Sequence, residues 1–185
     1  MDPTDFVSQI REDYLRQFEA FVDKQTRSSL KGASEVKLRL SNESQVYQHL
    51  YCADFIKNDG EEPEVIELQP NVLCFEPLSG FFGGAALTIE HLRWDDVVIH
   101  HDASEPSNGL ASWFSRWFDP EDRRHDGSVK MGDVIHSLLV EPGTLSVDMG
   151  TAASDALWDV LDLLEKAGAQ SIRISASRAD ADNAT

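Results

Sequence analysis

The sequence is short of three things: cysteine, basic residues and long hydrophobic runs. Only Cys52 and Cys74 occur among its 185 residues, too few for a disulfide framework, and we expect both to be small buried apolar groups. No stretch approaches the roughly 20 apolar residues that a membrane span needs. The acidic start at residues 1–5 lacks the basic and apolar regions of a secretory signal. These absences predict a reduced, soluble, cytoplasmic protein.

Basic residues are outnumbered, since 16 Lys and Arg stand against 33 Asp and Glu and the net charge is −17. Such a chain repels nucleic-acid phosphates, whose recognition depends on Lys and Arg, and it repels anionic membrane surfaces. A basic protein would instead be attracted to it. We therefore expect a basic protein partner and neither nucleic acid nor membrane. Solubility, or adaptation to a salt-rich cytoplasm, would produce the same excess of acid.

The first two thirds of the chain contain helix and strand patterns. Apolar residues recur at three- and four-residue spacing over 3–24, which predicts an amphipathic helix. Alternation and turn signals then predict a series of strands. These strands are expected at 36–40, 46–56, 65–68, 72–75, 85–94 and 97–102. The glycine-dense segment 79–84 matches no phosphate-binding motif, so we interpret it as a turn or bulge and expect no cofactor.

The last third has the clearest pattern. Strands at 134–141 and 144–149 flank Pro142-Gly143, a pair suited to a type II turn. A helix is expected to run to about residue 167 and to end at Gly168, before a final strand at 170–175. This order permits a parallel crossover, although an antiparallel placement is equally open.

The whole pattern predicts one α+β domain over 1–176, followed by a disordered tail at 177–185. Its sheet is expected to be mostly antiparallel, with an N-terminal amphipathic helix, a short aromatic-rich helix, and a C-terminal helix followed by a final strand.

Three residues form the only candidate metal site in these patterns. If Asp95-Asp96 is a two-residue hairpin turn, His91 faces His100, and Asp102 lies on the same face as His100. Two imidazoles and one carboxylate can hold a divalent transition metal with open positions. The prediction depends on the register, because a slip of one residue would reverse the faces.

Two segments are candidates for binding a partner. Residues 54–67 hold six acids against one lysine, and Glu61, Glu62 and Glu64 stand together in its polar loop. Residues 109–118 form the aromatic-rich helix, in which Trp113, Trp117 and Arg116 are residue types enriched at interface hot spots. Aromatic residues at this helical spacing are usually core packing, and binding to a partner is the alternative.

Two hypotheses of function follow. The first is a non-enzymatic interaction protein, of an inhibitor or immunity type, that binds a basic protein partner through its acidic surface. The second is a metal-dependent or small-ligand enzyme that uses the face formed by His91, His100 and Asp102. Whether the protein is an enzyme is left open by the sequence.

Overall fold

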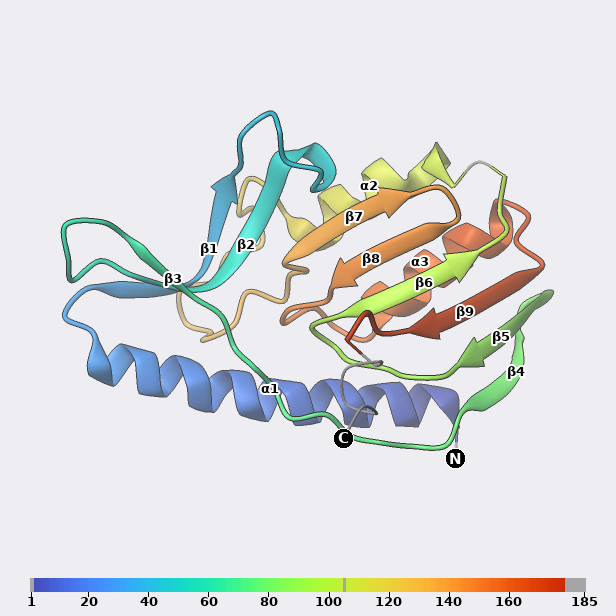
Figure 1. Cartoon of the computed structure of the whole chain (residues 1–185), viewed down its shortest axis with the longest axis horizontal. Helices are drawn as coiled ribbons and strands as arrows, with labels where there is room; N and C mark the ends of the chain where they lie inside the picture. The colour runs from blue at the N-terminus through green and yellow to red at the C-terminus, as the bar shows by residue number, and fades with distance from the viewer. Residues whose placement is uncertain (1, 105, 179–185) are drawn as a thin grey trace.

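A computed structural model describes residues 2–104 and 106–178 as an α+β fold with two mostly antiparallel sheets (Figure 1). The predicted fold class is confirmed. The helical segments of the described chain are α1 (Pro3–Ser28), the 3-10 turn η1 (Tyr47–His49), α2 (Ser107–Phe118) and α3 (Asp155–Lys166). Asp2 caps α1 by accepting a hydrogen bond from the Thr4 amide at 2.8 Å, and Pro3 occupies the first helical position.

The smaller sheet has three antiparallel strands in the order β1-β2-β3. These strands are β1 (Gly32–Arg39), β2 (Leu50–Lys57) and β3 (Glu64–Ile66). The register pairs Ser34 with Phe55 and Val36 with Ala53, so Glu35 and Asp54 take facing positions between them. Residues 58–63 connect β2 to β3 at one end of the molecule (Figure 1); we call residues 58–64 the β2–β3 loop.

The larger sheet has six strands in the order β4-β5-β9-β6-β8-β7. They are β4 (Leu78–Phe82), β5 (Ala85–Ile89), β6 (Val97–His101), β7 (Ser137–Glu141), β8 (Thr144–Asp148) and β9 (Ser171–Ser175). Only the pair of β5 and β9 is parallel. Both β8 and β9 run antiparallel to β6, so the chain from β8 through α3 to β9 is a parallel crossover with β6 between its strands.

The hairpin expected between 85–94 and 97–102 is wrong, because β9 lies between β5 and β6. Asp95-Asp96 is not a two-residue turn between paired strands; instead the Asp96 amide donates to the Arg93 carbonyl at 3.1 Å within a longer connection. Ile172 and Ile174 of β9 are buried, which gives this strand a reason to occupy a central position.

Of two other local expectations, one is confirmed in part and one is wrong. The glycine-dense segment does contain a turn, at Gly83-Gly84 where Gly83 has φ +56°, but residues before the turn belong to β4, which pairs with β5. No strand forms at 72–75. The pattern there was misleading because residues 72–74 are exposed and have no neighbouring strand to pair with.

The hydrophobic core lies between the larger sheet and helices α2 and α3, which cover one of its faces (Figure 1). Leu145 and Val147 of β8 point into this core, whereas Thr144, Ser146 and Asp148 alternate onto the opposite, more open face. Helix α1 buries Phe6, Val7, Ile10, Tyr14 and Phe18. None of the helices formed by described residues is long and apolar enough to cross a membrane.

The expectations for the last third are confirmed in outline. Gly143 has φ +71° in the turn between β7 and β8, and Gly168 has φ +92° just after α3. Positive φ is costly for residues with a Cβ, which explains both glycines. Of the predicted tail, Ser177 hydrogen-bonds Asp96 at 2.7 Å and Arg178 pairs with Asp95 at 2.8 Å. The remainder of that prediction, 179–185, lies outside the described residues.

Candidate functional site

Four ionisable side chains meet where the two sheets come together. We call Glu35, Asp54, His136 and Asp148 the junction cluster. Glu35 and Asp54 come from facing positions on β1 and β2, His136 directly precedes β7, and Asp148 ends β8. The backbone of His136 joins the sheets, because its amide donates to the Asp148 carbonyl at 2.9 Å and its carbonyl accepts from the Cys52 amide at 2.8 Å.

The imidazole of His136 lies between two carboxylates. Its Nδ1 is 2.9 Å from Asp54 Oδ1, and its Nε2 is 3.1 Å from Glu35 Oε1. The residue has no exposed surface. Desolvation opposes charge on the ring, but the surrounding negative charge and the hydrogen bonds to Asp54 and Glu35 outweigh it and raise the pKa of His136 well above its ordinary value. The two carboxylates therefore favour the protonated form of the ring.

Glu35 and Asp54 have further donors besides His136. The Gly132 amide and the Thr151 hydroxyl donate to Glu35, the former at 2.6 Å, and the Leu68 amide donates to Asp54 at 2.7 Å. Desolvation alone would raise the pKa of both carboxyls, but the hydrogen bonds and the charge of His136 lower it below the ordinary value. Like charges on facing strand positions repel; here one shared cation holds them together.

Asp148 is the least satisfied member of the junction cluster. Its Oδ1 accepts one hydrogen bond, from the Gly150 amide at 2.9 Å. Desolvation raises the pKa of Asp148 to about 7, and the negative charge of Asp54 acts in the same direction against the attraction of His136. The backbone beside it is closely packed, since Gly150 has φ +49° and a Cβ there would lie 2.2 Å from His136 Cδ2.

Of the groups of His, Cys, Asp and Glu formed by described residues, Asp54, His136 and Asp148 have the arrangement of a metal site. One ligand atom from each lies within 4.8 Å of the others. As an acid–base site the cluster is poor, because both ring nitrogens of His136 are already held by carboxylates. Cys52 beside it is fully buried, and desolvation raises the pKa of its thiol to about 12, which keeps it from acting as a nucleophile.

The structure does not bring His91, His100 and Asp102 together as the expected hairpin would. His91 is exposed and lies outside β5 and β6. His100 Nε2 is 3.2 Å from Ser175 Oγ of β9, and Asp102 accepts from the Gln170 and Ser171 amides at 2.8 and 3.1 Å. The insertion of β9 therefore removes the register on which this metal prediction depended.

The aromatic helix, now α2, is core packing. Trp113 and Trp117 are 5% and 4% exposed, and their indole nitrogens donate to the Ala156 carbonyl and the Asp159 carboxylate of α3 at 2.9 and 3.0 Å. Arg116 is exposed, pairs with Asp159 at 3.2 Å and stacks 4.9 Å from the Trp117 ring. The two tryptophans expected as partner anchors thus face α3, because the helix needs its apolar stripe to attach to the core.

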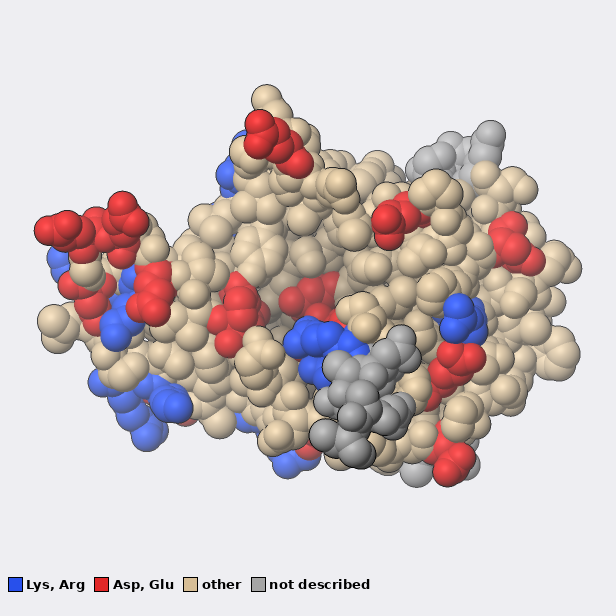
Figure 2. All heavy atoms as spheres, in the orientation of Figure 1, with Lys and Arg blue, Asp and Glu red and all other residues tan. Residues whose placement is uncertain are grey.

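The acidic residues of the β2–β3 loop are placed differently. Glu61, Glu62 and Glu64 are exposed, and acidic side chains gather at this end of the molecule (Figure 2). Within the described chain, no ion pair or hydrogen bond engages any of their carboxylates. The base of the loop is fixed, since the Lys31 amide donates to Asp59 at 2.7 Å and the Asn58 amide donates to the Lys31 carbonyl at 2.7 Å.

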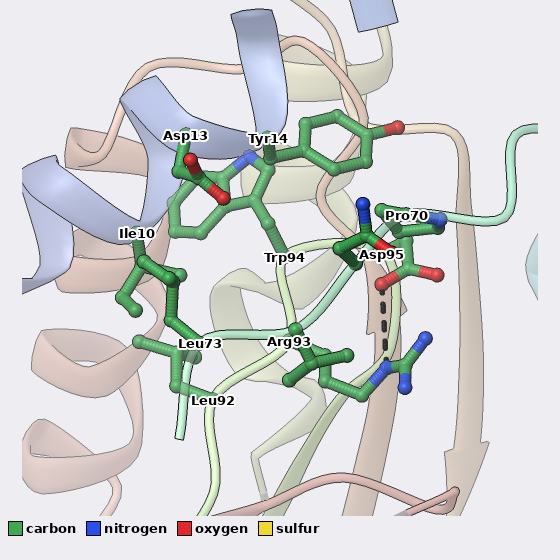
Figure 3. A pocket seen from close by; sticks show the side chains of 11 residues that line it. Ile10, Asp13, Tyr14, Pro70, Leu73, Leu92, Arg93, Trp94 and Asp95 are labelled. Atoms are coloured by element: carbon green, nitrogen blue, oxygen red, sulfur yellow. Dashed lines mark ion pairs between the residues drawn. The ribbon is translucent and has the colours of Figure 1, made fainter. Parts of the chain in front are cut away.

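A small hollow opens between α1 and the segments around Asn71 and Trp94 (Figure 3). Its volume of about 20 Å³ is enough for a single water molecule. Figure 3 shows Tyr14 beside the Trp94 indole and Arg93 paired with Asp95, at 3.6 Å. The hollow is too small for an organic ligand, so we do not interpret it as a binding pocket.

Sequence reasoning missed the junction cluster. A faint signal exists, because Asp54 interrupts the apolar run at 52–56 and His136 interrupts the one at 134–139. A charged residue inside a buried strand needs a partner, but the sequence does not show which distant residue supplies it. Comparison with known proteins adds no name: no family model, no curated protein and no solved structure matches this chain.

Proposed function

We propose that this protein is a non-enzymatic binding protein, of the inhibitor or immunity type, that recognises a basic protein in the cytoplasm through its β2–β3 loop. The observation that carries the proposal is the set of exposed carboxylates on Glu61, Glu62 and Glu64, which form no ion pair or hydrogen bond with the described residues, although Glu64 faces Lys57 across the strand pair. Unpaired charges on one projecting loop steer an oppositely charged partner and increase the rate of encounter.

The way the loop is anchored supports this role. Asp59 accepts from the Lys31 amide and lies 3.7 Å from Lys57 Nζ, so the start of the loop is tied to the chain before β1. Glu61 and Glu62 extend beyond that anchor, and Glu64 begins β3 opposite Lys57. A fixed loop loses less conformational entropy on binding than a mobile one, so its charges can contribute more to affinity.

The buried tryptophans change the surface that we assign to the partner. Because Trp113 and Trp117 pack against α3, the proposed binding surface is the β2–β3 loop without α2. The exposed Arg116 has a charge that would repel a basic partner, so we leave it outside this surface.

Capture from a lysate of the native host, with a charge-matched control, tests the proposal. The immobilised wild-type protein is compared with the triple variant Glu61→Lys, Glu62→Lys, Glu64→Lys. The control is Glu43→Lys, Glu76→Lys, Glu141→Lys, which makes the same change in net charge at exposed positions with no ion pairs to described residues. Bound proteins are eluted with increasing salt and identified by mass spectrometry.

We expect one basic protein to bind the wild type and the control and to be lost from the loop variant. Association of that purified protein should then slow at least tenfold on the loop variant, with a weaker dependence on salt. Equal loss from both variants would mean that net charge alone attracts the protein, and it would overturn the assignment to the loop. Failure of the wild type to retain any basic protein would overturn the proposed function.

A further inference from the structure

The junction cluster has the composition and geometry of a metal site, and it is separate from the β2–β3 loop. We propose that it binds one divalent transition-metal ion of the Zn²⁺ type through His136 Nδ1, Asp54 and Asp148. Glu35 does not ligate the metal in this arrangement. It holds the opposite side of the imidazole.

The distances among the donor atoms suit such an ion. His136 Nδ1 and Asp54 Oδ1 are 2.9 Å apart. Neighbouring ligands of a tetrahedral ion with bonds of about 2.1 Å lie roughly 3.4 Å apart, so a bound ion would separate these two atoms slightly. The donor atom of Asp148 lies within 4.8 Å of both, and within the described chain one hydrogen bond, from Gly150, holds its carboxylate.

The contacts behind the imidazole are those of a metal-ligating histidine. A histidine ligand commonly donates its second N–H to a carboxylate, which fixes the tautomer and orients the ring. Glu35 accepts from Nε2 at 3.1 Å and is itself fixed by Gly132 and Thr151. With Nε2 protonated in this way, Nδ1 can present its lone pair toward Asp54 and Asp148.

The balance of charge favours a cation with more than one positive charge. Three carboxylates surround a single imidazole, and within the described chain the ion pairs of these carboxylates are those of Glu35 and Asp54 with His136. A divalent ion would bring two positive charges to its two carboxylate ligands, Asp54 and Asp148.

Of the three proposed ligands, Asp148 reaches the open face of the larger sheet: it alternates onto that face with Ser146 and is half-buried. His136 and Asp54 are buried. Since Asp54 belongs to the smaller sheet and Asp148 to the larger, a bound ion would join the two sheets directly.

Calorimetric titration with ZnCl₂ tests the inference on the whole chain after treatment with a chelator. We expect one Zn²⁺ per chain, and Mg²⁺ at the same concentration should not compete, because imidazole favours zinc.

Two variants separate this site from the alternative suggested by the sequence. Asp148→Asn removes one ligand while retaining the shape of the side chain, and it should weaken Zn²⁺ binding at least tenfold with an unchanged circular dichroism spectrum. His100→Ala should leave the affinity unchanged. An absence of stoichiometric binding at micromolar Zn²⁺, equal affinity in Asp148→Asn, or loss of binding in His100→Ala would each overturn the proposal.

Discussion

The junction cluster and the β2–β3 loop are both rich in carboxylates, yet their environments are opposite. In the junction cluster Glu35 and Asp54 each accept from His136 and from backbone amides. In the loop, Glu61, Glu62 and Glu64 have no partner within the described chain and are surrounded by solvent. The acidic residues behind the net charge of −17 therefore have two different roles. A few of them stabilise the fold through buried hydrogen bonds, and others lie on the surface and add negative charge there.

The largest effect should come from removing the cation of the junction cluster. His136→Ala leaves Glu35 and Asp54 facing each other without their shared partner, so we expect the free energy of unfolding to fall by about 3–5 kcal/mol. Urea denaturation measures the change. His91→Ala, at an exposed position, is the control and should change stability by less than about 0.5 kcal/mol. If His91→Ala lowered the free energy of unfolding as much as His136→Ala, the prediction that the junction cluster stabilises the fold would be contradicted.

A smaller loss is expected from crowding the same imidazole. Gly150→Ala forces a Cβ to within 2.2 Å of His136 Cδ2 at a residue with φ +49°, and we expect a loss of about 2–3 kcal/mol. Gly80→Ala is the matched control, because no atom lies within 4 Å of a Cβ at that position. Thermal unfolding of both variants checks the prediction. An equal melting temperature for Gly150→Ala and the wild type would contradict it.

The pH dependence of stability should distinguish Asp148 from the loop acids. The pKa of Asp148 is raised to about 7 in the folded state, above its unfolded value of about 3.9. The folded state therefore binds more protons between these two values, and stability falls as the pH rises through that window. Asn cannot ionise, so Asp148→Asn should gain stability relative to wild type, by roughly 2–3 kcal/mol more at pH 8 than at pH 5.

Urea denaturation of chelator-treated protein at the two pH values measures this difference. Asp155→Asn is a suitable control, since Asp155 is exposed in the first turn of α3. A difference between Asp148→Asn and wild type that does not change with pH would mean that Asp148 does not titrate in this range.

The smallest effect is expected in the loop. Replacement of Glu61, Glu62 and Glu64 together by Gln should change the free energy of unfolding by less than about 0.5 kcal/mol, because exposed charges without partners contribute little to stability. Chemical denaturation checks this. A loss above about 1 kcal/mol would show that the loop acids stabilise the fold, and the two regions would then resemble each other.

Local patterns in the sequence predicted much of the fold, and long-range pairing accounts for most of what they missed. Helix α1, the β7–β8 turn at Gly143 and the end of α3 at Gly168 follow from periodicity and from glycine conformations that neighbouring residues determine. The position of β9 depends on its pairing with β5 and β6, strands that lie roughly 70 to 85 residues before it in the sequence. Neighbouring residues carry no such information, so the hairpin expected around Asp95-Asp96 was wrong.

The same limit applies to the candidate sites. The loop acids are adjacent in the sequence and could be identified as a charged surface, although their role stays a prediction. The junction cluster combines Glu35 with His136, about 100 residues later, through a contact that only the packing of the two sheets creates. The tryptophans of α2 could be assigned to a helix but not to a side of it, because both interpretations share one periodicity.

The central position of β9 has a consequence for the order in which the molecule can fold. During synthesis, β5 and β6 emerge from the ribosome roughly 70 residues before the strand that pairs with both of them. At about 5–20 residues per second, they wait several seconds with unpaired edges. Exposed edges of this kind favour pairing with other chains. The larger sheet is therefore most vulnerable to aggregation while its chain is still being made, and a chain that ends before β9 would keep that vulnerability permanently.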